Sequence, residues 1–518
     1  MEASATTDWL ALLGLAALLP LTAFGLHRVF LLARFRWRPR SRSSWTGTAG
    51  DGEQDLPFVT VQLPLFNESA VAGRLLEFIG RLDYPRDKLE VQVLDDSTDE
   101  TRELVRRGVE RLRDNGLTVA LLRRTARRAF KAGALDAGLA QARGELICIF
   151  DADFMPEPSF LRDTVGAFEH PAVGAVQARW AHHNRDANTL TRAAGTLLDG
   201  HFVIEHTVRH ERGLFFNFNG TAGLWRRVAI TASGGWSGDT LTEDLDLSYR
   251  AQLAGWKFVY LPMVEAAAEL PQEVAAYRGQ QYRWARGSLQ VLRKLGWQLA
   301  TSRQRMHVRI ESLVHLVGNV GHPAVLLLAF LLPLTARLES GRGGLGHLLA
   351  FLVCTGSYFL FYDASQRALG RPFWKRSVDV ILAMSLGIGM AVNQTLAVID
   401  GLMRGAGVFV RTPKQGLGGQ AMETGAGAED SVTDAPSASA ILTQAATQTA
   451  AQVRPTKIPW PELLLSAWII WGVYNALASR NWGAVPFQVL FLSGFLWVGL
   501  LTMPAKRRLH AAFGLFLI

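Results

Sequence analysis

Long apolar runs lie toward both ends of the 518-residue chain, and a polar region of alternating pattern separates them. A helix rises about 1.5 Å per residue, so runs of roughly 20 residues can cross a bilayer. The first run is Trp9–Leu32, and the later ones are Ile310–Thr335, Leu345–Tyr362, Val378–Ile399, Glu462–Leu477 and Val485–Leu501. The pattern therefore predicts membrane helices on both sides of a soluble domain.

Residues 55–305 show the alternation of short strands and helices that is typical of an α/β domain. Buried strands are predicted at Val59–Leu63, Glu90–Leu94 and Leu146–Phe150. Helices are predicted between and after them, at Ala70–Arg81, Thr101–Asn115 and Ala132–Ala142. Such alternation implies a parallel sheet with ligands at the carboxyl ends of its strands.

Composition agrees with this division. The chain is 49% hydrophobic and 19% charged, with a mean hydropathy of +0.12, which favours a protein partly in lipid. Two cysteines exclude a disulfide scaffold, and the apolar content excludes disorder across the whole chain. Residues 416–457 are rich in small and polar residues and are predicted to be a disordered linker.

The net charge of +9 is mostly a signal of membrane topology. Five arginines between Arg34 and Arg42 place that side of the membrane in the cytoplasm by the positive-inside rule. If Val378–Ile399 crossed fully, the basic segment around Arg411 and Lys414 would lie outside. We therefore expect Val378–Ile399 to be interfacial or re-entrant, with five other crossings, the N-terminus outside and the C-terminus inside.

The expected order of segments follows from these patterns. It begins with an N-terminal transmembrane helix (1–33), a basic cytoplasmic linker (34–54) and the α/β domain (55–305). A transmembrane helix pair (306–365) and an interfacial or re-entrant helix with a loop (366–415) come next. The disordered linker (416–457), a second transmembrane helix pair (458–503) and a cytoplasmic tail (504–518) complete the chain.

Pairs of carboxylates follow two of the predicted strands. Asp95 and Asp96 suit either a turn before a capped helix or recognition of a base or ribose. Asp151 and Asp153 can converge on Mg²⁺ or Mn²⁺, which would bridge to a diphosphate. An ordinary acidic turn is the alternative for the second pair.

Two further motifs have a structural and a functional interpretation. Thr242-Glu243-Asp244 precedes a helical pattern, so it is either a helix cap or the place of a general base. In the stretch Gln280–Trp284, Arg283 suits phosphate and Trp284 suits stacking on a sugar ring. An amphipathic interfacial helix is the alternative there.

Three histidines, His201, His206 and His210, lie close together in a region of helical pattern. Zinc binding is disfavoured, because the segment has neither a His-Glu-x-x-His pattern nor a cysteine partner.

In their order along the chain, these motifs resemble the processive glycosyltransferases of family 2, the cellulose, chitin and hyaluronan synthases. The cellulose-synthase-like mannan and glucomannan synthases are the most similar group. The stretches that carry the resemblance are Val91–Asp99, Phe150–Phe154, Val176–Trp180, Phe216–Gly223, Glu243–Leu247 and Gln280–Trp284. The resemblance implies a GT-A (Rossmann-like) catalytic domain inserted in an α-helical transmembrane domain, a nucleotide-diphospho-sugar donor and Mg²⁺ or Mn²⁺.

Matched position by position, the resemblance also implies roles for single residues. The residues that would bind the nucleotide sugar are Asp96, Lys131, Asp151, Gln280 and Arg283. Asp151 and Asp153 would hold the metal, Asp244 would be the catalytic base, and Trp284 and Glu243 would face the acceptor. A gating loop of the form Phe-x-Val-Thr-x-Lys would correspond to Phe409, Arg411, Thr412 and Lys414, with Arg411 where the family usually has Val.

The leading hypothesis is a membrane-embedded inverting glycosyltransferase. It would transfer a hexose from GDP-mannose or UDP-glucose to a growing β-linked glucan or mannan and help to secrete it. The alternatives are transfer of a single sugar to a membrane lipid, or a transporter or scaffold that only binds nucleotide sugar. The expected location is a bacterial inner or plasma membrane, with the catalytic domain in the cytoplasm. Envelope or secretion proteins are expected partners, and nucleic acid is not.

Overall fold

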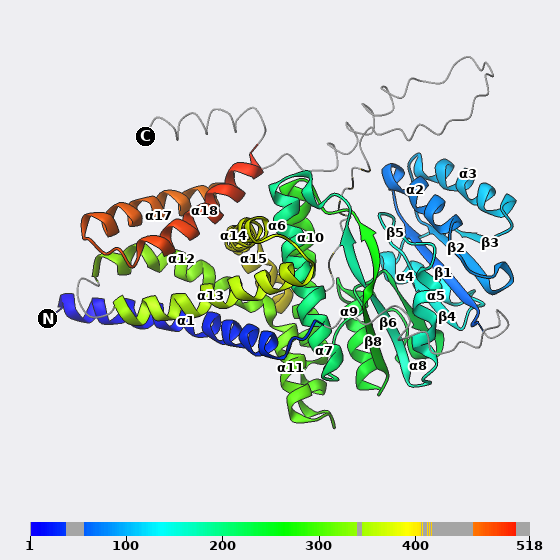
Figure 1. Ribbon diagram of the computed structural model, residues 1–518, viewed down its shortest axis with the longest axis horizontal. Helices are drawn as coiled ribbons and strands as arrows, with labels where there is room; N and C mark the ends of the chain where they lie inside the picture. The colour runs from blue at the N-terminus through cyan, green and yellow to red at the C-terminus, as the bar shows by residue number, and fades with distance from the viewer. Residues whose placement is uncertain are drawn as a thin grey trace, which may run out of the picture.

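The computed structural model describes residues 2–37, 56–338, 344–405 and 459–503, together with the single residues 407, 412, 414 and 416. An α/β domain lies on one side of the molecule and a group of long helices on the other (Figure 1). Most of the predicted basic and disordered linkers and the C-terminal tail, at 38–54, 417–457 and 504–518, fall outside the described residues.

The α/β domain is built on one eight-stranded sheet with the order β3-β2-β1-β4-β7-β6-β8-β5. The strands are β1 (Val59–Leu65), β2 (Leu89–Asp95), β3 (Thr118–Leu122), β4 (Leu146–Ile149), β5 (Met155–Pro156), β6 (Val173–His182), β7 (Gly223–Arg226) and β8 (Lys257–Ala268). β2, β1 and β4 run parallel, as predicted, and β3, which was not predicted, is parallel to β2, whereas β7 is antiparallel to both β4 and β6. The expectation of a wholly parallel sheet is therefore wrong for the half that follows β4.

Helices cover the sheet because each presents one apolar stripe to it. In α3 (Thr101–Asp114), buried Val105, Val109 and Leu112 recur at helical spacing and join the same core as α2 (Ser69–Gly80). The other helices of the domain are α4 (Phe130–Leu139), α5 (Phe160–Val165), α6 (Thr189–Asp199), α7 (Thr207–Glu211), α8 (Arg227–Ala232), α9 (Glu243–Leu253) and α10 (Val274–Thr301). A π-helix, η6 (Gly200–His206), joins α6 to α7.

The apolar runs form helices beside the domain (Figure 1). They are α1 (Glu2–Arg34), α11 (Met306–Leu316), α12 (Gly321–Leu338), α13 (Gly344–Ala368), α14 (Phe373–Gly389), α15 (Ala391–Met403), α17 (Trp460–Ala478) and α18 (Val485–Thr502). Among the described residues, parts of α1 and α18 are long and apolar enough to cross a membrane. Two bent pairs, α11 with α12 and α14 with α15, would raise the number of such spans from two to four.

Both bent pairs bear on the predicted spans. Ile310–Thr335 is not one continuous helix, because α11 and α12 meet at 50° across the turn at Gly318–Val320. Val378–Ile399 likewise contains a 52° bend, at Met390 between α14 and α15. A bend of this kind fits a broken span as well as a re-entrant segment, so the predicted placement of this segment stays a prediction.

Buried ion pairs fasten the domain to the helices. Arg192 Nη2 of α6 lies 2.5 Å from Asp379 Oδ1 of α14, and Arg278 Nη1 of α10 lies 2.9 Å from Glu462 Oε1 of α17. Both carboxylates are almost completely buried, where an unpaired charge would be strongly unfavourable. Tyr282 of α10 also donates a hydrogen bond to Asp400 of α15. These contacts fix α10 between the sheet and the helices.

Close packing between α14 and α18 gives a test of the fold. A Cβ on Gly389 of α14 would collide with the Gly494 carbonyl and Val498 of α18, whereas one on Gly387 would meet nothing within 4 Å. We expect Gly389→Ala to lower the free energy of unfolding by about 1–3 kcal/mol through overpacking. Gly387→Ala should raise it by up to about 1 kcal/mol, because alanine favours helix. Thermal unfolding in detergent measures both, and equal shifts would contradict this packing.

Candidate active site

A cavity of about 190 Å³ opens where the parallel strands end. Its lining comes from the segments after β1, β2 and β4, from the starts of α4 and α9, and from α10. Eleven of the thirteen residues predicted for the site line it: Asp96, Lys131, Asp151, Asp153, Glu243, Asp244, Gln280, Arg283, Trp284, Thr412 and Lys414. The other two, Phe409 and Arg411, lie outside the described residues.

The two adjacent aspartates after β2 differ in their partners. Asp95 is buried, accepts the Ser97 backbone N–H at 3.0 Å and pairs with Arg123 Nε at 2.9 Å. Asp96 lines the cavity and accepts two hydrogen bonds from the Arg124 guanidinium. Neither Ser97 nor Thr98 caps α3, because Glu100 holds the N-cap position without a side-chain bond. Asp95 thus stabilises the turn, and Asp96 faces the site.

The basic side chains opposite Asp96 were not predicted from the sequence. Arg127 Nε lies 3.9 Å from Asp96 Oδ2, and its guanidinium stacks 3.4 Å above the Phe66 ring. The run of arginines at 123, 124, 127 and 128 was the available signal, yet only the fold brings these residues opposite the carboxylate.

Each carboxylate of the Asp151-Ala-Asp153 motif is paired with a lysine ammonium. Lys131 Nζ lies 2.6 Å from Asp151 Oδ1 and also donates to the Gly220 carbonyl at 2.9 Å. Lys414 forms an ion pair with Asp153, and its Nζ lies 3.9 Å from Glu68 Oε1. Burial opposes the charge of Lys131, but Asp151, Glu243 and Asp244 outweigh it, so its pKa is raised. The edge of the cavity formed by Asp151 and Asp153 is therefore stable only with cations beside it.

This edge fits a divalent metal ion. Oxygen ligands from closely spaced carboxylates are those that Mg²⁺ and Mn²⁺ prefer, and the two ammonium groups mark where positive charge is held. In the described part of the chain, no three His, Cys, Asp or Glu side chains come together as a metal cage. A metal at Asp151 and Asp153 would thus take further ligands from substrate or water, as Mg²⁺ commonly does.

Glu243 and Asp244 begin α9, and Thr242 makes no side-chain capping bond there. Burial, and then the charge of Glu243, raise the pKa of Asp244 to about 7, although Lys131 opposes the rise. Burial also raises the pKa of Glu243. A Cβ on Gly220 would lie 2.9 Å from Asp244 Oδ2. Because Gly220 also has φ +80°, only glycine fits easily at position 220. Asp244 therefore has a proton affinity suited to a base near neutral pH.

The opposite wall comes from α10. Arg283 Nη2 donates to Thr412 Oγ1 at 2.5 Å, and burial lowers the pKa of Arg283 to about 10. Trp284 faces Trp180 of β6 with ring centroids 6.5 Å apart. Trp180 also packs edge-on against Phe154. Trp180 belongs to one of the stretches that carry the family resemblance, but it was not predicted as a site residue. The sequence pattern of a strand does not show which of its two faces meets a cavity.

A second cavity of about 370 Å³ adjoins the first. Both cavities are lined by Trp180, Leu198, Asn219, Thr242, Asp244 and Trp284. The second continues along α1, α11 and α13 and borders a third cavity of about 320 Å³, with Arg28, Tyr277, Gln281 and Tyr362 among the shared residues. Asp244 and Trp284 thus stand between the strand-end cavity and a row of cavities that leads into the helices.

The architecture is that of a GT-A-like fold, with a mixed sheet and an acidic site at its strand ends. A solved structure with the same fold is the mannosyltransferase PcManGT from Pyrobaculum calidifontis, in complex with GDP-Man and Mn²⁺. It is 23% identical in sequence, has a TM-score of 0.51, and the match covers 76% of this chain and 99% of that one.

Residues 57–287 match the family described as "Glycosyltransferase like family 2", and this domain is similar to the members of that family. It is 42% identical over 276 residues to "Probable glucomannan 4-beta-mannosyltransferase 7" of Oryza sativa subsp. japonica, covering 52% of this chain and 47% of the relative. It is 40% identical over 285 residues to "Glucomannan 4-beta-mannosyltransferase 2" of Arabidopsis thaliana, covering 53% of each. The chain thus spans about half the length of the curated relatives it matches.

The raised pKa of Asp244 predicts a pH-dependent gain in stability when its charge is removed. The carboxyl binds protons more tightly in the folded state, so it destabilises the fold increasingly as pH rises from about 4 to about 7. We expect Asp244→Asn to raise the thermal midpoint clearly at pH 8 and much less at pH 5. Asp239→Asn, at a half-exposed carboxylate outside the cavity, is the control. A gain that grows toward acid pH would contradict the burial of an ionised Asp244.

Proposed function

We propose that the protein is an inverting glycosyltransferase that extends a β-mannan-type polysaccharide from a nucleotide-diphospho-sugar. The observation that most directly supports this proposal is the position of Asp244. It is a buried carboxyl with a raised pKa, and it lies where the strand-end cavity meets the second cavity. The family of the domain and the names of its relatives support the same reaction.

The donor occupies the strand-end cavity in this proposal. Asp96, next to Arg124 and Arg127, faces the nucleotide, and Lys131 and Arg283 neutralise the diphosphate from opposite walls. Gln280 lies on the same wall as Arg283 and hydrogen-bonds the donor. Asp151 and Asp153 hold Mg²⁺ or Mn²⁺, which when bound stabilises charge on the leaving diphosphate.

The acceptor enters from the second cavity. Trp284 and Trp180 offer aromatic faces to a sugar ring, and Glu243 lines the strand-end cavity with them. Asp244 removes the proton from the acceptor hydroxyl as that oxygen forms the new bond to the anomeric carbon. The bond from that carbon to the diphosphate breaks in the same displacement, so the configuration inverts. No covalent intermediate with the protein is needed.

The second and third cavities provide a route for the growing chain. They run from Asp244 and Trp284 past Arg28, Tyr277 and Gln281 into the space between the helices. Membrane embedding, secretion through this route and a cytoplasmic catalytic domain therefore belong to the proposal, as does the location in an inner or plasma membrane. The predicted domain boundaries, and envelope or secretion partners, are proposed on the sequence pattern alone.

The donor we propose is GDP-mannose. The relatives are named as 4-beta-mannosyltransferases, and the solved structure with the same fold is described with GDP-Man and Mn²⁺. Purified protein in detergent, offered GDP-mannose or UDP-glucose with Mg²⁺ or Mn²⁺, should release GDP and form β-linked mannan. Release from UDP-glucose alone would contradict the donor, and products of a single added sugar on lipid would contradict polymerisation.

Asp244 is the proposed catalytic base, so its substitution tests the proposed chemistry. Asp244→Asn should lower turnover by about 10²–10⁴-fold, because an amide cannot accept the proton. Binding of GDP should stay within about threefold, which isothermal calorimetry measures. Asp239→Asn should keep full activity. Retained turnover in Asp244→Asn would exclude this base.

We also propose that Lys414 holds the place of a cation beside Asp153 when no donor is bound. Its ammonium forms an ion pair with one of the two proposed metal ligands, and Asp153 raises the pKa of Lys414 although burial opposes this. Removing this charge should favour a metal ion. We expect Lys414→Met to bind Mn²⁺ about tenfold more tightly in the absence of nucleotide, as seen by electron paramagnetic resonance. Lys294→Met, which removes a lysine outside the cavity, should bind Mn²⁺ like the wild type; weaker binding by Lys414→Met would refute the proposal.

A further inference from the structure

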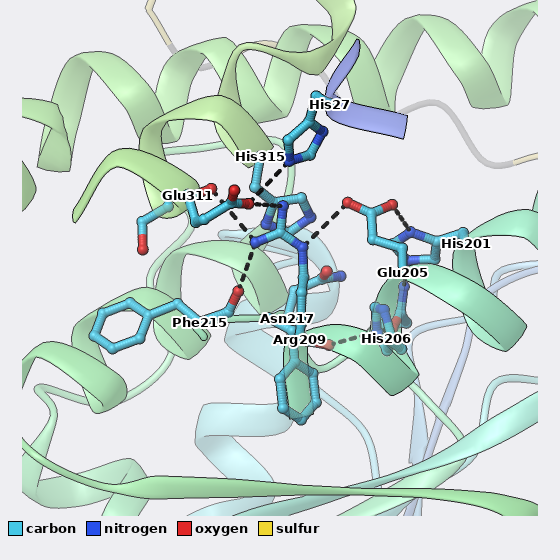
Figure 2. Close-up of polar contacts among 12 residues, drawn as sticks. His27, His201, Glu205, His206, Arg209, Phe215, Asn217, Glu311 and His315 are labelled. Carbon is cyan, nitrogen blue, oxygen red and sulfur yellow. Dashed lines mark hydrogen bonds and ion pairs between the residues drawn. The ribbon is translucent and has the colours of Figure 1, made fainter. Parts of the chain in front are cut away.

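A connected row of six histidine, glutamate and arginine side chains (Figure 2) lies along the second cavity, which four of them line, and the proposed reaction uses none of them. The row crosses four elements of the structure: η6, α7, α11 and α1. Its members are His201, Glu205, His206, Arg209, Glu311 and His27. So many polar groups in one buried wall need a common explanation.

The π-helical backbone of η6 puts two of these histidines on one face. The i→i+5 hydrogen bonding of a π-helix brings residues five apart toward the same side, and the rings of His201 and His206 lie 4.2 Å apart between centroids. Both rings reach Asn219 in the loop between α7 and β7. His206 Nε2 is 2.8 Å from Asn219 Oδ1, and His201 Nε2 is 3.2 Å from Asn219 Nδ2.

The direction of each hydrogen bond follows from one backbone carbonyl. His206 Nε2 also lies 3.2 Å from the Asn217 carbonyl, which can only accept, so this nitrogen carries a proton. Asn219 Oδ1 then accepts from His206, and Asn219 Nδ2 donates to His201 Nε2. His201 Nε2 is therefore the acceptor, and its Nδ1–H donates to Glu205 Oε2 at 3.0 Å.

Glu205 is fixed in turn from the membrane side. Arg209, whose side chain is fully buried, donates from Nε to Glu205 Oε1 at 3.2 Å. Its Nη2 lies 3.7 Å from Glu311 Oε2 of α11, and that carboxylate accepts from His27 Nε2 of α1 at 2.9 Å. Burial opposes the charge of Glu205, but His201 and Arg209 outweigh it and lower its pKa well below the usual range. Glu205 is thus a fixed anion that sets the tautomer of His201.

The other end of the row touches the proposed reaction centre. Asn219 lines both cavities, and its backbone N–H donates to Gln177 Oε1 at 2.8 Å. The next residue, Gly220, packs against the Asp244 carboxylate and accepts from Lys131. The position of the Asn219 side chain therefore sets the backbone against which Asp244 and Lys131 lie.

We propose that His201 is a positioning residue for transfer, held in its Nδ1–H tautomer by Glu205, and that it orients the Asn219–Gly220 loop against Asp244. This inference rests on the proposed function. His201 acts through Asn219 at the junction of the two cavities, so its loss should affect the displacement step and leave donor binding unchanged.

Two substitutions separate the hydrogen bond from the shape of the ring. His201→Phe keeps a ring but removes the acceptor for Asn219 Nδ2, and it should lower kcat about 10- to 100-fold. His201→Gln can place its Oε1 near the position of Nε2, and it should keep kcat within about threefold of the wild type. The donor KM and GDP affinity should stay within about threefold in both variants. His307→Phe, at an exposed histidine of α11, is the matched control.

Glu205→Gln tests the link to the membrane side. It should lower kcat, and the double variant with His201→Phe should lose no more than His201→Phe alone, because Glu205 acts through His201. A wild-type kcat in His201→Phe, an equal loss in Gln and Phe, or additive losses would overturn the inference. If His201→Phe does not fold, all three outcomes are replaced by one result that would overturn the inference: a kcat in Glu205→Gln equal to the wild type. Absence of GDP release by the wild type would instead refute the proposed function.

Discussion

Compensation of buried charge is the constraint on which this structure depends. The carboxyl ends of β2 and β4 bring Asp95, Asp96, Asp151 and Asp153 close to one another, and such a group of anions is stable only with cations beside it. The cations come from segments far apart in the sequence. The arginines after β3 pair with Asp95 and Asp96, and Lys131 and Lys414 pair with Asp151 and Asp153. The site is therefore assembled from long-range ion pairs.

Asp244 is the exception that gives the site its chemical character. It is close enough to Lys131 for attraction, yet burial and Glu243 still raise its pKa to about 7. A group held near neutrality can exchange a proton at small energetic cost, whereas each of the other aspartates lies against a cationic side chain. The difference between these carboxylates comes from their surroundings, since the side chains of the aspartates are chemically identical.

Three of the four strands of the parallel half, β1, β2 and β4, could be predicted from sequence, because they are short apolar runs separated by helices. β6 and β8 could not, since they alternate less regularly and pair across more than 70 residues. Eleven site residues were found because their motifs keep acids, bases and aromatics at recognisable spacings. Trp180 and the arginines opposite Asp96 were missed for another reason: their role depends on which face of the fold they reach. The bend at Gly318 was not predicted, although Gly318, Asn319 and Gly321 are residues common in turns, and the bend at Met390 lies in the segment that was expected to be interfacial or re-entrant.

The ion pairs between the α/β domain and the helices have a practical consequence for anyone who wishes to study the domain separately. Cutting the chain near residue 305 would strip Arg192 of Asp379, Arg209 of Glu311 and Arg278 of Glu462. Three guanidinium groups would lose carboxylate partners at once, on a face that also carries apolar surface from α6 and α10. An isolated domain would therefore be prone to aggregation, and a soluble version would need these arginines and their apolar neighbours redesigned together.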